Sequence, residues 1–382
     1  MCRLEEYNLG DLTNSFDYKR RPLNERQREV MKNNEEELYP YCGANGIVDY
    51  IDDFIFNEEI ICIAEDGGYW EANQKSSYIM TGPCWVNNHA HVLTAREKLN
   101  LSYLNYQLFH LDLTRYITGS TRGKLTRKEL DRIRIKVPSM LIQSKIVSVL
   151  DQSQSLIDKR KAQLEALDQL AQSVFLEMFE DGSMKFDMVS LGNYTSHVSS
   201  GATPRGGQKA YCTQGIPLIR SQNIRMNRVD IGNAVFISEP THESMKRSQV
   251  MKNDVLLNIT GASIGRVAVY NGEDNSANVN QHVCIIRTLN INPIYVSRFI
   301  ASNRFQDSIK RLNSGATREA LNYSQIKKFE IPFPPIEVQN QFANIIQQIE
   351  AQKSLLQKSL TELENNFQSL MQRAFRGELF PE

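Results

Sequence analysis

Several features that would assign this 382-residue chain to a special class are missing from its sequence. Its six cysteines, at positions 2, 42, 62, 84, 212 and 284, form no CxxC pair and no short metal-binding spacing. This pattern excludes a disulfide scaffold and is typical of reduced intracellular thiols. No apolar run approaches the roughly 18 residues of a membrane span, and the opening Met-Cys-Arg-Leu-Glu-Glu does not resemble a signal peptide. We therefore expect a soluble, cytoplasmic protein.

The chain also lacks a net charge, because 44 basic side chains balance 44 acidic ones. The balance hides a segregation of charge along the sequence. Residues 1–137, 138–184 and 334–382 have net charges of −3, −3 and −2, whereas residues 185–333 carry +8. A local basic cluster also lies within residues 115–136. Such patches are typical of polyanion-binding surfaces, although a solvated charged face gives the same pattern.

Catalytic motifs are absent or incomplete. Residues 119–125 are one residue short of a phosphate-binding P-loop and end in Leu instead of Ser or Thr. Residues 333–336 read Phe-Pro-Pro-Ile, which is not the Asn/Asp-Pro-Pro-aromatic loop of an adenine-N6 methyltransferase. His89 and His91 could share a strand face as zinc ligands, but no Cys or acid follows at a suitable spacing. We predict that the chain performs no covalent chemistry and holds no metal.

The sequence does contain an internal repeat. A shift of 196 residues places the last third of the chain on its middle without a gap, and it matches Gly119 with Gly315, Thr121 with Thr317, Pro138 with Pro334, Gln143 with Gln339, Leu164 with Leu360 and Phe179 with Phe375. We therefore predict a tandem duplication, in which each half has a variable globular block followed by a more similar tail.

The two tails have the pattern of long helices. Residues 142–180 contain no Gly or Pro, and a mainly apolar stripe steps by alternating four and three positions from Ile146 to Met178. The same stripe recurs 196 residues later, from Phe342 to Ala374. Two matching heptad stripes in one chain most simply pair with each other.

The blocks between the tails are rich in strand patterns. Buried strands are predicted over residues 50–56 and 60–64 of the first block, and over residues 255–259 and 266–270 of the second. Apolar-periodic stretches precede the tails at residues 101–116 and 294–312. The predicted division is a first block over residues 1–137, a first helical tail over 138–184, a second block over 185–333 and a second helical tail over 334–382.

Several short segments are specific enough to suggest a family. The second block contains Gly-Ala-Thr-Pro at 201–204, Gly-Ile-Pro-Leu-Ile-Arg at 215–220, Leu-Asn-Ile-Thr-Gly-Ala-Ser-Ile-Gly-Arg at 257–266 and Asn-Gln-His-Val at 280–283. The first block contains Tyr-Cys-Gly-Ala-Asn-Gly-Ile at 41–47, Ala-Glu-Asp-Gly at 64–67 and Trp-Val-Asn-Asn-His-Ala-His-Val at 85–92. Together with the duplicated helices, these segments resemble the specificity subunit of type I restriction–modification systems over essentially the whole chain.

The resemblance implies an α+β fold, with two α/β target-recognition domains separated by two long antiparallel, coiled-coil-like helices in a pseudo-two-fold tandem repeat. Each domain would read one half of a bipartite, gapped site in double-stranded DNA, and the helices would fix the gap. Two adenine-N6 methyltransferase subunits and two restriction/translocase subunits would be the protein partners. The resemblance implies no cofactor on this chain, because S-adenosylmethionine, ATP and Mg would belong to the partners. Since the two blocks differ in sequence, we expect an asymmetric target.

Candidate DNA-binding residues are polar or basic side chains and glycines in the loops of these segments, because Arg can bind guanine, Asn can bind adenine and basic groups can bind phosphate. Phosphate contact, solvation or a structural turn remain open for each. In the first block they are Lys19, Arg20, Arg21, Asp66, Gly67, Gly68, Asn87, Asn88, His89, Arg122 and Lys124. In the second block they are Arg205, Arg220, Asn223, Arg225, Arg228, Thr260, Ser263, Arg266, Asn280, Gln281, His282 and Arg318.

Apolar residues outside the heptad stripe are candidates for methyltransferase docking, or they widen the core between the helices. These residues are Leu156, Phe175, Phe179, Leu355 and Phe375. Two other classes of function stay open from the sequence. One is a recognition subunit of another multisubunit restriction or methylation system, and the other is a coiled-coil scaffold that binds protein.

Overall fold

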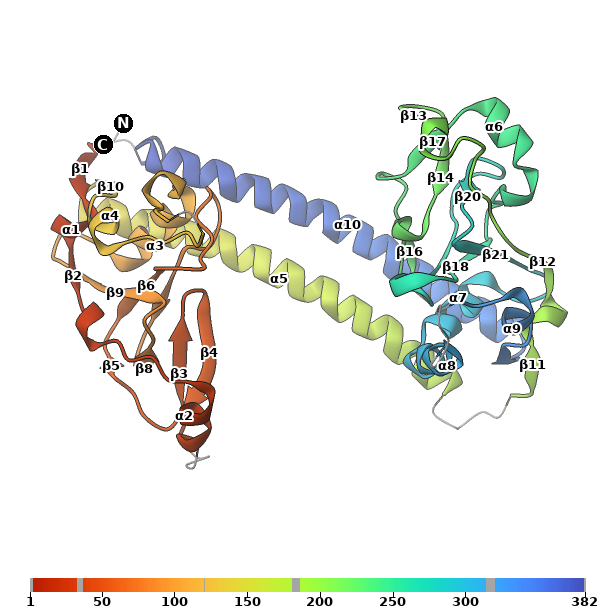
Figure 1. Cartoon of the computed structure of the whole chain (residues 1–382), viewed down its shortest axis with the longest axis horizontal. Helices are drawn as coiled ribbons and strands as arrows, with labels where there is room; N and C mark the ends of the chain where they lie inside the picture. The colour runs from red at the N-terminus through yellow and green to blue at the C-terminus, as the bar shows by residue number, and fades with distance from the viewer. Residues whose placement is uncertain (1–2, 33–36, 120, 181–185, 314–319, 381–382) are drawn as a thin grey trace. The chain divides into compact units, whose positions relative to one another are not determined.

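A computed structural model describes residues 3–32, 37–119, 121–180, 186–313 and 320–380. The chain divides into two compact units (Figure 1). Unit 1 contains residues 1–162 and 358–382, and unit 2 contains residues 163–357. Two helices of 40 residues each, α5 (Met140–Phe179) and α10 (Ile336–Phe375), begin in one unit and end in the other. Their bounds differ by the 196 residues of the sequence repeat.

Unit 1 is built on two four-stranded sheets with the orders β2-β9-β6-β7 and β4-β3-β8-β5, and a two-stranded sheet β1-β10 (Figure 1). Its strands are β1 (Glu5–Asn8), β2 (Thr13–Ser15), β3 (Tyr39–Gly43), β4 (Gly46–Ile51), β5 (Phe56–Asn57), β6 (Ile60–Ala64), β7 (Ser77–Met80), β8 (Pro83–Val86), β9 (Ala90–Ala95) and β10 (Arg134–Val137). Its short helices are α1 (Leu9–Leu12), α2 (Glu25–Val30), α3 (Leu101–His110) and α4 (Arg127–Asp131).

Unit 2 repeats this plan, with four-stranded sheets in the orders β12-β21-β18-β19 and β13-β17-β14-β20, and two-stranded sheets β11-β22 and β15-β16. Its strands are β11 (Met188–Ser190), β12 (Thr195–Ser200), β13 (Tyr211–Cys212), β14 (Ile216–Ile219), β15 (Ile224–Arg225), β16 (Arg228–Val229), β17 (Val235–Ile237), β18 (Val255–Asn258), β19 (Val267–Val269), β20 (Asn278–Val279), β21 (Val283–Thr288) and β22 (Glu330–Pro332). Its shorter helices are α6 (Glu239–Ser244), α7 (Pro293–Ala301), α8 (Asn303–Asn313) and α9 (Tyr323–Lys327).

The two units correspond element by element around their first sheets. In both, the sheet is antiparallel, and one of its two central strands follows a strand of the second sheet after a short connection: β9 follows β8 in unit 1, and β21 follows β20 in unit 2. In both, a parallel pair occurs in the second sheet, β3 with β8 and β14 with β20. The tandem α/β organisation predicted from the sequence is therefore confirmed.

One hydrophobic core layer of each unit lies between its two four-stranded sheets, and in unit 2 a larger buried cluster includes residues of α5, α7, α8 and α10. In unit 1, Cys42, Cys62, Cys84, Phe56 and Val92 pack together there with further apolar side chains of β3, β5, β6, β8 and β9. In unit 2, side chains of β14, β18, β19, β20 and β21 form the equivalent layer. Of the cysteines in the described residues, Cys42, Cys62, Cys84 and Cys284 are buried, whereas Cys212 is exposed.

Within each unit, a segment of α5 packs antiparallel to a segment of α10. In unit 2, Phe175 and Phe179 near the end of α5 contact Phe342 near the start of α10. Lys353 pairs with Asp168 at 2.5 Å in unit 2, and Lys161 pairs with Glu364 at 3.3 Å in unit 1. Every position of the predicted heptad stripe is buried or half-buried, which confirms the pattern as the seam between the helices.

The start of each long helix is fixed to its block by a buried glutamine. Gln143 accepts a hydrogen bond from the backbone N–H of Asn100 and donates to the carbonyl of Pro138. Gln339 makes the same two bonds, with Asn292 and Pro334. The recurrence of Gln at this position in both tails therefore reflects an equivalent helix anchor, because a buried carboxamide requires partners for both of its ends.

One predicted strand is wrong. Residues 50–56 do not form one strand, because β4 ends at Ile51 and β5 begins at Phe56. The backbone N–H of Asp52 bonds to the carbonyl of Met31, and the Asp53 carboxylate accepts from the N–H of Phe54. These local bonds turn the chain between the two strands, as Asp often does in turns. The apolar stretch 101–116 forms α3 over its first ten residues, and the stretch 294–312 forms α7 and α8.

Candidate nucleic-acid interface

Three loops of unit 1 meet at the end of β6. The N–H of Glu65, just after β6, donates to the carbonyl of His89 at 2.8 Å, and the N–H of Leu125 donates to the carbonyl of Glu65 at 2.8 Å. The Asn87 side chain accepts from the N–H of His89 at 2.8 Å and closes the connection between β8 and β9. We call this junction, residues 64–68, 87–89 and 122–125, site 1. It brings together eight of the predicted residues from three separate segments.

Unit 2 has the same junction at the end of β18. The N–H of Ile259 donates to the carbonyl of His282 at 3.0 Å, and the N–H of Leu321 donates to the carbonyl of Ile259 at 2.9 Å. The Asn280 side chain accepts from the N–H of His282 at 3.1 Å. We call residues 259–263, 280–282 and 320–321 site 2. The two sites therefore share one backbone framework, although their side chains differ.

The side chains of site 1 form a network of charges. Asp66 accepts hydrogen bonds from His89 at 2.7 Å and from Arg122 at 3.0 Å. Glu65 pairs with Arg20 at 2.5 Å and with Lys124 at 2.8 Å. Burial raises the pKa of Glu65, but the hydrogen bonds from Lys124 and Arg20 outweigh burial, and the pKa lies below its ordinary value. Site 1 therefore holds the Glu65 carboxylate ionised between two basic side chains.

Beneath this network lies His91, which is 1% exposed. Its Nδ1 lies 2.6 Å from the carboxylate of Asp17, and its Nε2 lies 2.8 Å from the carbonyl of Leu125. Burial raises the pKa of Asp17, but the hydrogen bond and charge of His91 hold that pKa below its ordinary value. Sequence reasoning missed Asp17 and Glu65; the one available signal was for Glu65, an ionisable residue directly after the buried strand β6.

Acid should destabilise unit 1 by protonating Glu65. A carboxyl with a lowered pKa in the folded state contributes stability above its unfolded pKa, and this contribution disappears as the pH falls through the folded pKa. We expect Glu65→Gln to lower the free energy of unfolding by about 2 kcal/mol at pH 7. The difference from the unchanged protein should shrink as the pH falls below about 4. Urea unfolding followed at several pH values measures it.

The exposed Glu59 gives the control for this experiment. Glu59→Gln should change the stability by less than about 0.5 kcal/mol at every pH. A stability difference for Glu65→Gln that stays constant from pH 7 to pH 3 would contradict the role given to the Glu65 carboxylate.

Site 2 contains a chain of neutral hydrogen bonds in place of the charged network of site 1. The Thr203 hydroxyl lies 2.7 Å from Gln281 Oε1, and Gln281 Nε2 lies 2.9 Å from His282 Nε2. His282 Nδ1 lies 2.6 Å from the Thr260 hydroxyl. Three predicted residues, Thr260, Gln281 and His282, are thus joined. Thr203 lies in the Gly-Ala-Thr-Pro segment at 201–204 but was not predicted as a site residue.

The predicted arginines of unit 2 differ in their surroundings. Arg225 and Arg228 are exposed and oppose each other across the β15–β16 hairpin. Arg205 is exposed in the loop after β12, and Arg220 lies over the ring of Tyr211. Like charges that oppose each other across a hairpin repel, so a polyanion that neutralises Arg225 and Arg228 would stabilise the pair.

The structure corrects the prediction for Asn223. This residue is 1% exposed, its carbonyl oxygen accepts from the N–H of Arg220, and its amide donates to the carbonyl of Asp230. Asn223 therefore holds a turn and presents no group to a ligand. Arg20 is similarly engaged, because it binds Glu65 and the carbonyl of Ala90 from a half-buried position.

The remaining predicted residues lie around the two sites. Arg21 and Asn88 are exposed, and the Lys19 ammonium lies 4.8 Å from the ring centre of Phe16. Gly67 has a positive φ of 64°, and an added Cβ at Gly68 would contact the Cβ of Ala64 at 2.3 Å. Ser263 accepts from Asn258, Arg266 is half-buried, and Arg318 lies outside the described residues.

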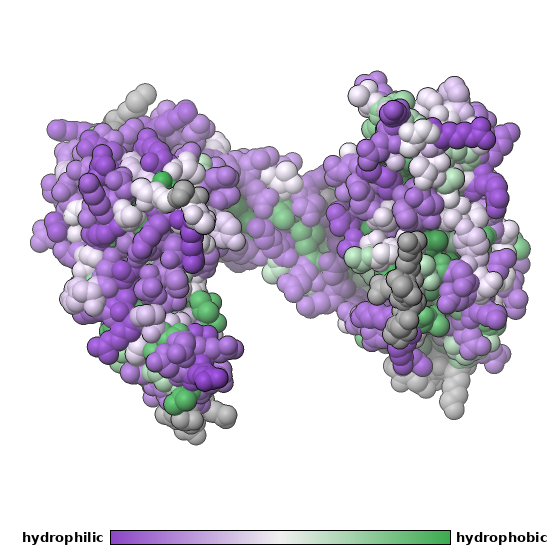
Figure 2. Space-filling model, in the orientation of Figure 1, coloured by the Kyte–Doolittle hydropathy of each residue, from purple (hydrophilic) through white to green (hydrophobic). Residues whose placement is uncertain are grey.

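The prediction for the helices is corrected in part. Phe175, Phe179 and Phe375 are only 4%, 7% and 6% exposed, so they widen the core and are not available to a partner. The reason is that the C-terminal end of each long helix packs on a globular block. Phe179 of α5 packs on Tyr295 in unit 2, and Phe375 of α10 packs on Tyr103 in unit 1. Leu156 and Leu355 are 52% and 67% exposed and remain candidates for docking. Figure 2 shows that the visible face of each unit is mainly hydrophilic.

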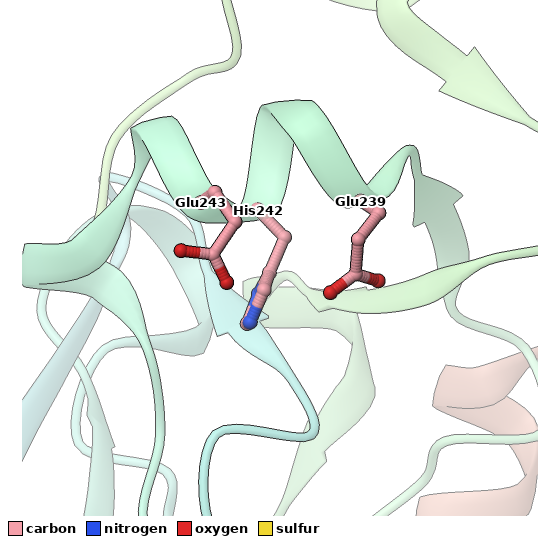
Figure 3. A group of neighbouring side chains, drawn as sticks. All are labelled: Glu239, His242 and Glu243. Atoms are coloured by element: carbon pink, nitrogen blue, oxygen red, sulfur yellow. The ribbon is translucent and has the colours of Figure 1, made fainter.

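Two groups of residues resemble metal sites by composition. His91 cannot join His89 as a zinc ligand while its ring nitrogens bond to Asp17 and Leu125. In Figure 3, His242 lies on α6 with Glu239 and Glu243 on either side. His242 is buried, with Nδ1 2.5 Å from the Asn278 oxygen and Nε2 3.2 Å from the Gln249 amide nitrogen. Both nitrogens are therefore committed to structural hydrogen bonds.

Comparison with known proteins agrees with this geometry. The chain matches the family described as type I restriction modification DNA specificity domain twice, over residues 3–167 and 196–365. A putative type I restriction enzyme specificity subunit from Haemophilus influenzae is 27% identical over 346 residues, which are 85% of this chain and 82% of the relative. The EcoBI specificity subunit from Escherichia coli is 25% identical over an alignment of 420 positions, which covers 99% of this chain and 86% of the relative.

Solved structures show the same fold. The crystal structure of the type I restriction–modification S subunit from M. genitalium matches with a TM-score of 0.65 at 15% identity, over 100% of this chain and 97% of that one. A chain from a study of complex assembly and conformational transition of the type I R-M system matches with a TM-score of 0.56 at 15% identity. The match covers 99% of this chain and 100% of that one. This chain thus belongs to the specificity subunits of type I restriction–modification systems, with two copies of their DNA specificity domain.

Proposed function

We propose that site 1 and site 2 each read one half of a bipartite, gapped target in double-stranded DNA. The observation that carries this proposal is the repetition of one backbone junction, with the bonds Glu65–His89 and Leu125–Glu65 in unit 1 and Ile259–His282 and Leu321–Ile259 in unit 2. Base reading depends on side-chain donors and acceptors at base edges. Because the first site is ionic and the second is neutral, the two half-sites should differ, and the target should be asymmetric.

Phosphate contacts would come from the basic groups near each site. Exposed arginines such as Arg205, Arg225 and Arg228 supply positive charge in unit 2, and Arg122 and Lys124 do so in unit 1. The whole chain is neutral, so its affinity for DNA alone should be weak. Methyltransferase subunits that close around the DNA would supply the remaining affinity.

The proposed assembly contains one specificity chain, two adenine-N6 methyltransferase subunits and two restriction/translocase subunits. The exposed Leu156 and Leu355 on the long helices are the docking candidates, and the helices would also set the separation of the half-sites. Among the described residues, no helix combines the length and apolar character needed to cross a membrane.

The chain itself would be non-catalytic, with S-adenosylmethionine, ATP and Mg bound by the partners. Two observations support this division of labour. Burial raises the pKa of the Cys62 thiol well above its ordinary value and that of Cys284 to about 12, so neither is a thiolate at neutral pH. His91 and His242 are committed to structural hydrogen bonds.

Modified-base sequencing tests the proposal. DNA from cells that express this chain with its cognate modification subunit should carry a new N6-methyladenine motif that is gapped and asymmetric. DNA from cells with the modification subunit alone is the control and should lack the motif. A competent, expressed pair that leaves no new motif would argue against DNA specificity and favour a protein-binding scaffold.

A further inference from the structure

The exposed side chain of Gln281 is held in a defined orientation at site 2. Thr203 lies 2.7 Å from its Oε1 on one side, and His282 lies 2.9 Å from its Nε2 on the other. Gln281 Nε2 can only donate, so His282 Nε2 accepts, and His282 Nδ1 donates to Thr260 at 2.6 Å. The backbone of His282 is fixed in turn, because its backbone N–H donates to the side-chain oxygen of Asn280 at 3.1 Å.

These contacts use half of the hydrogen-bonding capacity of the carboxamide. A glutamine side chain has two N–H donors and two lone pairs on its oxygen. One N–H is taken by His282, and one lone pair is taken by Thr203. One donor and one acceptor therefore remain for a ligand, and they would remain even if the amide were turned over.

A donor beside an acceptor matches one base edge in the major groove. Adenine presents the N7 acceptor next to the N6 amino donor, and Asn or Gln binds both atoms together. Guanine presents two acceptors, N7 and O6, so the Gln281 oxygen would face a second oxygen. We propose that Gln281 reads one adenine in the half-site of unit 2, with Thr203 and His282 as positioning residues.

This proposal rests on the proposed function, and it adds the base and the residue that reads it. The equivalent position of site 1 is also an exposed carboxamide, Asn88, between the buried Asn87 and the half-buried His89. A carboxamide at the same place in both copies of the junction agrees with a base-reading role. The two residues act on different half-sites, which makes Asn88 a control within the same chain.

The test uses the full chain with its modification subunit. The motif of the unchanged complex is determined first, because the absence of any motif would refute the proposed function and not this inference alone. Gln281→Ala should make one adenine position of one half-site degenerate and leave the other half-site unchanged. Asn88→Ala should leave that adenine position unchanged, and Gln208→Ala, at an exposed glutamine outside site 2, should leave the whole motif unchanged.

A chemical substitution in the DNA then tests the contact directly. Replacing that adenine by 7-deazaadenine removes the N7 acceptor and should weaken binding by the unchanged complex about 5- to 150-fold. The Gln281→Ala complex should show no further loss with the same DNA. Gln281→Glu retains the size of the side chain but loses the donor, and it should discriminate against adenine at that position.

Two results would overturn the inference. One is a Gln281→Ala complex that methylates the unchanged motif with the same fidelity. The other is a 7-deazaadenine effect of equal size in the unchanged and Gln281→Ala complexes. His282→Phe separates positioning from folding, because it should relax the same adenine position as Gln281→Ala while leaving the other half-site as it is.

Discussion

Replacing Phe179 by alanine should lower the stability of unit 2 by about 3–5 kcal/mol. The Phe179 ring lies 4.8 Å from the ring of Tyr295 and 5.2 Å from that of Phe342, and it also contacts Phe175. Removing it therefore opens a cavity where α5, α10 and α7 meet. Hydrogen exchange of the full chain measures the effect, because amides of unit 2 should lose protection while those of unit 1 retain it.

The repeat supplies a matched variant for this experiment. Phe375 stands 196 residues after Phe179 and packs on Tyr103 at 5.6 Å and on His110 at 5.3 Å in unit 1. Phe375→Ala should therefore reduce protection in unit 1 instead of unit 2. Leu355→Ala is the control on α10, and it should change the stability by less than about 0.5 kcal/mol because Leu355 is largely exposed. Equal losses for Phe179→Ala and Leu355→Ala would contradict this account of the core.

The most reliable information in the sequence came from its repetition. The bounds of α5 and α10 differ by the same 196 residues as the matched sequence, and Gln143 and Gln339 make equivalent bonds at the two helix starts. A helical stripe is a local pattern, so its periodicity appears directly in the sequence. The sequence did not show that the end of each helix packs on the block of the other half, because such packing depends on tertiary structure. For that reason the sequence left open whether Phe175, Phe179 and Phe375 dock a partner or widen the core.

The site was predictable as a set of loops but not as a network. The segments around Asp66, Asn87 and Lys124 each carry turn residues, and the sequence identified them one at a time. The first two segments meet because β6 pairs with β9, and the third is joined to them by the bond from the N–H of Leu125 to the carbonyl of Glu65; both are long-range contacts. Composition also could not separate Arg20 and Asn223, which make internal bonds, from Arg225, which is exposed. Charge and polarity give a residue its chemistry, whereas burial decides whether a ligand can reach it.

Gly201→Ala should disrupt the reading of the unit 2 half-site. Gly201 follows β12 and lies against the backbone that leads into site 2. A Cβ added at this glycine would stand 1.7 Å from the carbonyl oxygen of Val279 and 2.9 Å from that of Asn280. Real Cβ atoms do not approach that closely, so the end of β12 or the backbone at residues 279–280 must move. Because Gln281 follows directly, the move should separate it from Thr203.

We expect two measurable consequences of this change. The free energy of unfolding of unit 2 should fall by about 3 kcal/mol, at the upper end of typical overpacking effects. Binding to the cognate half-site should weaken about 5- to 150-fold, since the loss of one bidentate base contact is worth about 1–3 kcal/mol. Competition binding of the full complex against DNA altered in one half-site measures the second effect.

Gly232→Ala is the matched control, because the nearest atom to its added Cβ is the carboxylate of Asp230 at 3.6 Å. This variant should bind the target as tightly as the unchanged complex, and it should be as stable or slightly more so. If Gly201→Ala and Gly232→Ala complexes discriminate the half-site equally well, the close approach of β12 to residues 279–280 has no part in recognition. Loss of discrimination at the unit 2 half-site alone would tie the shape of this turn to base reading, because Gly201 offers no side chain of its own to the DNA.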